Sequence, residues 1–142
     1  MTRRKLIAAL KKAAEGCGYM FHTGLEHHLN NEVNHFPALW LLPPKVVATQ
    51  GREAGTKRYE ATLYLLETCS KGSEQEKEFC WTRMEETSSA ICRALCESEA
   101  VRYAEIESEI PDAYSLTNHG EVSLKVKLKV ELPFCRSESM HS

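Results

Sequence analysis

The sequence contains a strictly alternating run near its end, Val122-Ser123-Leu124-Lys125-Val126-Lys127-Leu128-Lys129-Val130-Glu131-Leu132. Successive side chains of a β-strand point to opposite faces of the sheet, so this run gives one aliphatic face and one charged face. The pattern is typical of an antiparallel sheet that packs on a core on one side and meets water on the other. It does not fit the parallel sheet of a nucleotide-binding enzyme, whose strands are buried on both faces. We therefore predict a long strand over residues 121–133.

The rest of the chain predicts two helices and several more strands. Apolar residues recur at helical spacing over residues 3–15 and 74–97, and Ser73 and Glu76 have the form of a capping box before the second helix. Strands are expected at residues 19–22, 36–42, 57–68 and 101–110, the third of them central in the sheet. Pro43-Pro44 must break or bend the second strand, which residues 45–48 could continue in another direction. Gly51 and Gly55, set among polar residues, predict a flexible hairpin loop over residues 49–57.

These elements predict an α+β fold in the order α-β-β-β-α-β-β. We expect a mainly antiparallel sheet of four or five strands, with the two helices packed on one face. The long helix should present an apolar stripe that includes Met84, Ile91 and Leu95, with Phe79 at one edge. One domain should span residues 1–135, and the polar residues 136–142 are expected to form a disordered tail.

Composition excludes several classes of protein. The chain has 142 residues, of which 42% are hydrophobic and 27% are charged, so it is neither disordered in composition nor too short to bury a core. No apolar run approaches the roughly 18 residues of a membrane span. The amino-terminal residues show helical spacing and no signal-peptide core, so we expect a cytoplasmic protein with no membrane partner. The net charge of −2 gives no argument for specific nucleic-acid binding.

Charge is nevertheless unevenly distributed along the chain. Residues 1–15 carry five basic side chains and one acidic side chain, a local net charge of +4. Residues 74–99 carry seven glutamates and three basic side chains, a local net charge of −4. Two interpretations stay open: both helices expose ordinary solvated faces, or their charged surfaces meet within a subunit or between subunits.

Two rows of opposite charge are expected on neighbouring strands. Glu105, Glu107 and Glu109 share one strand face, and Lys125, Lys127 and Lys129 share another. If the two strands pair in antiparallel fashion, the rows face each other across the sheet, and this is the interpretation that we favour. In the alternative, one row contacts a neighbouring subunit.

The cysteines and histidines form no recognisable catalytic or metal-binding motif. The six cysteines include no CxxC pair and are expected to be reduced thiols; they are Cys17, Cys69, Cys80, Cys92, Cys96 and Cys135. Cys92 and Cys96 are neighbours on one helix face and could form half of a metal site. His22, Glu26, His27, His28 and His35 more simply fit a polar loop, although a small enzyme that uses His27 and His28 with a metal is a third alternative. We expect no enzyme, no cofactor and no bound metal.

The order of elements resembles the tail terminator, tail completion and related minor tail proteins of long-tailed phages. The features that match are the leading amphipathic helix, the strand Phe36-Pro37-Ala38-Leu39-Trp40-Leu41, the strand 57–68, the long helix 74–97 and the alternating strand 122–132. The resemblance covers most of residues 3–134 at the level of architecture. It implies a structural subunit of a phage or prophage tail with no catalytic residues. Copies would assemble as a homo-oligomeric ring, with a hexamer as the expected size, and the ring would contact other tail or neck proteins.

If subunits meet through charged surfaces, ten residues are expected at the contacts. They are Arg3, Arg4, Lys11, Lys12, Glu78, Glu85, Glu86, Lys125, Lys127 and Lys129. Residues 49–57 would form an arm towards a tube or a neighbour. The alternative function is a small cytoplasmic binding module of ferredoxin-like or related fold, which recognises a protein or small ligand. A cleft lined by Trp40, Tyr59 and the histidines would favour that alternative.

Overall fold

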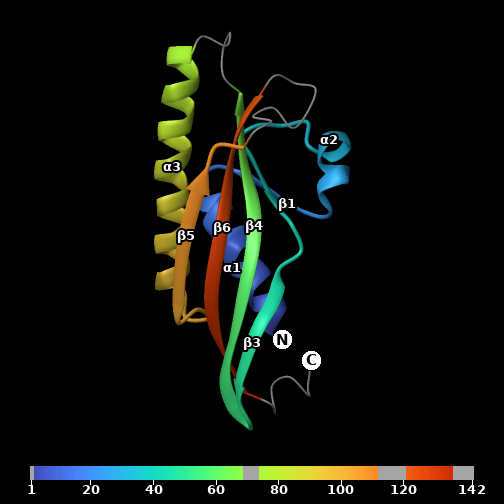
Figure 1. Cartoon of the computed structure of the whole chain (residues 1–142), viewed down its shortest axis with the longest axis vertical. Helices are drawn as coiled ribbons and strands as arrows, with labels where there is room; N and C mark the ends of the chain where they lie inside the picture. The colour runs from blue at the N-terminus through green and yellow to red at the C-terminus, as the bar shows by residue number, and fades with distance from the viewer. Residues whose placement is uncertain (1, 69–73, 112–120, 136–142) are drawn as a thin grey trace.

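One mixed sheet of six strands organises the chain, and the α+β class predicted from the sequence is confirmed (Figure 1). The computed structural model describes residues 2–68, 74–111 and 121–135. The strand order is β1-β2-β4-β6-β5, and β3 pairs with β4. The elements are α1 (Thr2–Gly16), β1 (Met20–Thr23), the 3-10 helix η1 (Glu26–His28), α2 (Leu29–Glu32), β2 (Ala38–Leu41), β3 (Lys45–Gly51), β4 (Ala54–Thr68), α3 (Glu74–Glu97), β5 (Tyr103–Glu109) and β6 (Glu121–Cys135).

Strands β4 and β6 form the centre of the sheet. They pair in antiparallel register along their whole length, from Ala54 opposite Cys135 to Thr68 opposite Glu121. The alternation of β6 is confirmed by burial, because Val126, Leu128 and Val130 are buried while Lys127 and Lys129 are exposed. One face of this pair therefore contributes to the core, and the other carries charge.

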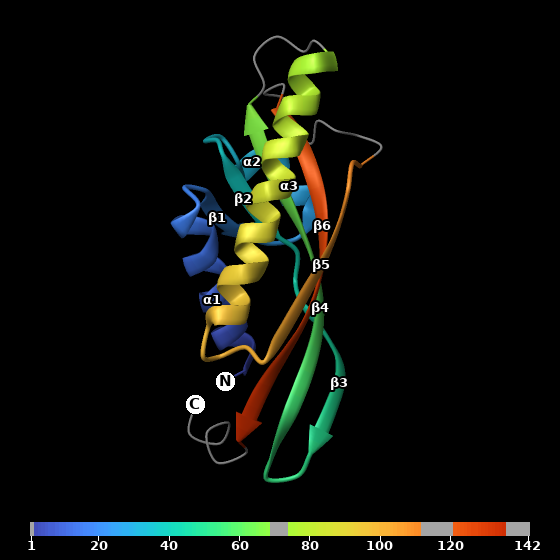
Figure 2. The same cartoon turned by 90° about the vertical axis from the view of Figure 1, so that its left-hand side faces the viewer.

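Helices α1 and α3 cover the aliphatic face of the sheet, as predicted (Figure 2). Leu6 and Leu10 of α1 and Met84 and Leu95 of α3 are completely buried in the main core. Leu6 and Leu10 are four residues apart and Met84 and Leu95 are eleven apart, and both spacings place the pair on one side of its helix, where burial removes apolar surface from water. Phe79 is an exception: it was expected at the edge of this stripe, yet it is 68% exposed because it lies outside the helix face that meets the sheet.

A second, smaller core lies on the opposite face of the sheet at one end. Leu29 of α2 and the following Val33 cover Trp40 of β2 and Tyr64 of β4 there. Strand β2 is thus sandwiched, and all four of its residues are buried. The short helix α2 lies in a segment expected to be mainly loop with room for one turn of helix, and it leaves most of this sheet face uncovered.

The sheet has six strands where four or five were predicted, because residues 45–51 form a strand of their own. The predicted, mainly antiparallel pairing holds for four of the five strand pairs described. Strands β1 and β2 are parallel, whereas the other pairs are antiparallel. Parallel neighbours need a crossover of a dozen or more residues, and the polar stretch that contains η1 and α2 provides it. Residues 49–57 are not a flexible loop, because β3 and β4 pair there as a hairpin.

Local backbone geometry explains this hairpin. Gly51 has a φ of 109°, and a Cβ on Gly55 would lie 1.8 Å from the carbonyl oxygen of Gln50. The two glycines thus permit a close approach of the strands that other residues would prevent. Pro43-Pro44 interrupts the chain between β2 and β3, yet both strands pair with the same edge of β4. The predicted capping box at Ser73 and the tail 136–142 lie outside the described residues.

Candidate functional site

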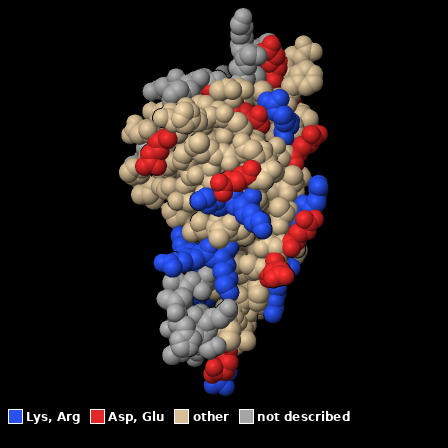
Figure 3. Space-filling model, turned by 180° about the vertical axis from the view of Figure 1, so that it is seen from behind, with Lys and Arg blue, Asp and Glu red and all other residues tan. Residues whose placement is uncertain are grey.

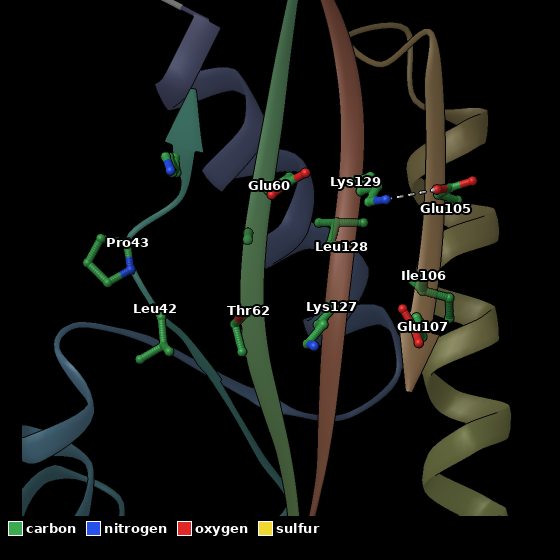
Figure 4. Close-up of a pocket in the computed structure, with 12 residues that line it drawn as sticks. Leu42, Pro43, Glu60, Thr62, Glu105, Ile106, Glu107, Lys127, Leu128 and Lys129 are labelled. Atoms are coloured by element: carbon green, nitrogen blue, oxygen red, sulfur yellow. Dashed lines mark ion pairs between the residues drawn. The ribbon is translucent and has the colours of Figure 1, made fainter. Parts of the chain in front are cut away.

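The uncovered part of the sheet carries the predicted rows of charge, and we call it the open sheet face. It is defined by six side chains on three strands: Glu60, Thr62, Glu105, Glu107, Lys127 and Lys129. Each points away from the main core because its neighbours in the strand point into it. Figure 4 shows these side chains on the same side of β4, β6 and β5.

The register of β5 and β6 confirms that the two rows face each other within one subunit. Glu105 lies opposite Lys129, Glu107 opposite Lys127 and Glu109 opposite Lys125. The lysine Nζ and carboxylate oxygen are 3.6 Å apart for Lys125 and Glu109. They are 3.9 Å apart for Lys127 and Glu109, and 4.0 Å apart for Lys129 and Glu105. Pairs of this kind in a sheet contribute roughly 0.2–1 kcal/mol each.

A groove of about 450 Å³ runs over the open sheet face. Leu42 and Pro43, in the crossover from β2 to β3, form one wall, and Glu105 and Glu107 of β5 form the other (Figure 4). Glu60 lies on its floor directly opposite Lys129 in the β4–β6 register. The groove was not predicted, because its wall depends on where the Pro43-Pro44 interruption places the chain. Its lining of alternating lysine and glutamate offers both donors and acceptors to a polar partner.

The smaller core borders this face and contacts His22, one of the histidines that the sequence analysis considered. The ring of His22 stacks on Trp40, with 5.8 Å between centroids. Burial lowers the pKa of His22, while the nearby Glu32 opposes this shift and His35 adds to it. Burial and the hydrogen bond from the Tyr64 hydroxyl to Glu26, 2.7 Å long, raise the pKa of Tyr64 to about 12. Both groups are therefore held uncharged near neutral pH.

The cleft lined by Trp40, Tyr59 and the histidines, which would favour the alternative function, does not form. Tyr59 is buried in the main core under the helices, and Trp40 is buried in the smaller core on the other face. Within residues 2–68, 74–111 and 121–135, no group of three or more histidine, cysteine, aspartate or glutamate side chains is arranged to hold a metal ion.

The charged residues of α1 and α3 lie on the helical side of the molecule, away from the open sheet face. Figure 3 shows basic side chains gathered where α1 lies, and mixed charges along the side formed by α3. Arg4, Lys11 and Lys12 are exposed on α1, and Glu78, Glu85 and Glu86 are exposed on α3. Arg3 differs, because its guanidinium donates to the carbonyl oxygen of Pro44 over 2.7 Å.

The ten predicted contact residues thus fall on three separate surfaces. Six exposed side chains form two surfaces of opposite sign on α1 and α3, whereas Lys127 and Lys129 of β6 belong to the open sheet face and Lys125 lies next to them in the same row. Within the described part of the chain, Arg4, Lys11 and Lys12 make no ion pair with α3, whereas the three lysines of β6 already pair with glutamates of β5. Arg3 connects the start of α1 to the segment between β2 and β3 through its hydrogen bond to Pro44.

Comparison with known proteins gives no assignment for this site. No protein-family model matches the chain, and no curated protein sequence matches it. None of the helices in the described part of the chain is long and apolar enough to cross a membrane.

Proposed function

We propose that this chain is a structural subunit that assembles with copies of itself, and specifically a tail completion or tail terminator subunit of a phage or prophage tail. The observation that carries self-assembly is the pair of exposed, oppositely charged helix surfaces described above. Arg4, Lys11 and Lys12 have no acidic partner on α3 within the described part of their own subunit. The α3 of a neighbour can supply that partner.

The two charged surfaces lie on different helices of the same chain, and this arrangement suits a head-to-tail contact between subunits. A contact between two different surfaces of the same chain leaves one of each unused, so it repeats until a ring closes or a filament grows. The architectural resemblance to tail completion proteins favours the ring. Such a subunit would assemble in the cytoplasm with other tail or neck proteins, and the proposal includes no catalytic activity.

The edges of the sheet support assembly in a second way. Strand β5 pairs only with β6, and β3 only with β4, among the strands that the structure describes. An unpaired edge exposes backbone donors and acceptors that a strand of another chain can bind. Val46 and Val47 of β3 are exposed apolar side chains beside one such edge. The hairpin of β3 and β4 extends past the end of α1 in Figure 2, as an arm would.

A second candidate is a binding module that uses the open sheet face. The groove over this face favours it, since Glu60 and Glu107 line the groove and make no ion pair within the described residues. A module of this kind would be monomeric and would bind a polar peptide or small ligand there.

Light scattering at two salt concentrations, followed by negative-stain imaging, distinguishes the two candidates. Self-assembly through charge predicts a ring or higher oligomer at low salt that dissociates as salt screens the contact. The reversal K11E/K12E should dissociate it, and adding E85K/E86K to the same chain should restore it because each contact then regains opposite charges. If the K11E/K12E variant still forms the oligomer, the contact between charged helices is wrong. A monomer at both salt concentrations would overturn self-assembly and leave the binding module.

A further inference from the structure

Two cysteines on α3 converge on a single backbone carbonyl. The thiol of Cys92 donates to the carbonyl oxygen of Ala104 over 3.5 Å, and the thiol of Cys96 donates to the same oxygen over 3.7 Å. Residues four apart on a helix are neighbours on one face, with their Cβ atoms about 5–6 Å apart. The shared acceptor therefore brings the two sulfur atoms to the same side of α3, where they face β5.

This pair is accessible from solvent, in contrast to the cysteine of the core. Cys96 is exposed and Cys92 is half-buried, whereas Cys80 is buried in the main core. Cys17 follows α1 and Cys135 ends β6, so each lies on a different element from the pair. Cys92 and Cys96 thus form a dithiol that a reagent can reach through the Cys96 side.

The number of sulfur ligands restricts what such a site can hold. A zinc site is normally completed by four ligands, and the described residues supply no group of three or more to complete one here. Thiolates favour soft metal and metalloid centres. A dithiol of this kind matches a three-coordinate centre that already has one organic substituent and needs only two thiolates. A monosubstituted trivalent arsenical is the simplest example.

We propose that Cys92 and Cys96 form a chelating dithiol site for soft, thiophilic centres that take two thiolates. With phenylarsine oxide as the ligand, two arsenic–sulfur bonds form and the arsenic–oxygen bond breaks. The two thiol protons leave with that oxygen as one molecule of water, and arsenic remains trivalent throughout. The hydrogen bonds that are lost all involve the two thiols, including those to Ala104, and none of them belongs to the helix backbone, so α3 need not unwind.

The surroundings of the pair predict how binding depends on pH. Burial raises the pKa of the Cys92 thiol, and the neighbouring Cys96 thiol and the Glu105 carboxylate shift it in the same direction. The thiolate is the form that attacks a thiophilic centre, so the adduct should form faster as pH rises above neutrality.

Phenylarsine oxide added to the reduced full chain tests this site by intact mass and by the count of free thiols. We expect one arsenical per chain, the loss of two free thiols, and release by a competing dithiol but not by the same concentration of a monothiol. A variant with one of the two thiols can form only one arsenic–sulfur bond and loses the second, intramolecular one. C92S and C96S should therefore each weaken binding by about a hundredfold or more. C17S is the control and should bind like the unmodified chain.

Cys96 is exposed, so C96S should fold, and circular dichroism can verify this for each variant. If C92S fails to fold, C96S decides the outcome alone. The proposal would be overturned if folded C96S bound the arsenical with unchanged affinity. It would also be overturned if C17S abolished binding. Self-assembly plays no part in this site, so the result is independent of the proposed function.

Discussion

The hydroxyl of Tyr19 donates a hydrogen bond to the carboxylate of Glu67, across 48 positions of sequence. The same carboxylate accepts from Arg83 of α3, with 2.9 Å between Nε and Oε1. Tyr19 and Glu67 are buried, while Arg83 reaches the surface. Burial and the hydrogen bond with Glu67 both raise the pKa of Tyr19, so its hydroxyl stays a donor at any ordinary pH. This network joins the residue immediately before β1, the end of β4 and the middle of α3.

Removal of the Tyr19 hydroxyl should destabilise the fold. A hydrogen bond to a charged group contributes about 1.5–3 kcal/mol, so Y19F should lower the free energy of unfolding in urea by that amount. Tyr103 provides a matched control, because its hydroxyl donates to Glu105 over 2.5 Å at an exposed site. Y103F should leave the free energy of unfolding unchanged within error. Equal losses in the two variants would contradict a special role for the buried network.

The β3–β4 hairpin should depend on Gly55. A Cβ at this position collides with the backbone of Gln50, and shifting the backbone to relieve such overpacking costs about 1–3 kcal/mol. G55A should therefore lower the urea midpoint and increase hydrogen exchange in β3. Gly16 has open space around the position of a Cβ, so G16A should change the free energy of unfolding by less than about 1 kcal/mol. A stable G55A variant with protected β3 amides would show that the hairpin does not need this close approach.

Acid should weaken the fold through His22. Its pKa in the folded chain lies below the usual value of 6.5 because burial disfavours the charged imidazolium. Above that value the imidazole is neutral in both the folded and unfolded chain, and its contribution to stability is complete. As pH falls from the ordinary pKa through the folded one, the unfolded chain binds the proton first, so stability is lost.

Urea unfolding at pH 7.5 and pH 5.5 measures this effect. H22F keeps a ring against Trp40 and should lose less stability between the two pH values than the unmodified chain does. H35Q, at an exposed position, should retain most of the original pH dependence. Identical pH dependence in H22F and the unmodified chain would assign acid sensitivity to other groups.

A charge swap between Lys125 and Glu109 should reveal how much the facing charged rows of β5 and β6 contribute to the free energy of unfolding. K125E places two carboxylates across the β5–β6 register at Glu109, and like charges there should cost about 0.2–1 kcal/mol. The double variant K125E/E109K reverses the pair and should restore most of the loss. High salt should reduce the difference between the single and double variants, because both side chains are partly exposed. A swap that fails to restore stability would argue that Lys125 acts through its packing.

The sequence predicted those features that a single strand or helix determines. The alternation of residues 122–132 identified β6 and its buried face, and the equal spacing of Glu105–Glu109 and Lys125–Lys129 indicated that the rows would meet. It did not reveal the parallel pairing of β1 with β2. That pairing depends on the path of the polar segment between the two strands, which the residues of the strands do not determine. It gave residues 45–48 only as a continuation of the preceding strand and interpreted residues 49–57 as a loop, because polar residues and glycines are common to loops and to exposed hairpins. The groove escaped prediction for a related reason: it forms where distant segments meet.

The pairing of β4 has a consequence for synthesis on the ribosome. One edge of β4 can bind β2 and β3 as soon as residue 68 has emerged, since all three segments are then available. Its other edge must wait for β6, whose last residue, Cys135, pairs with the first residue of β4. Throughout that interval the nascent chain displays one unpaired edge of β4 along its full length, next to the apolar side chains of its second half. Such a strand invites pairing with other chains, so the protein should depend on chaperones during translation more than a helical protein of its size does.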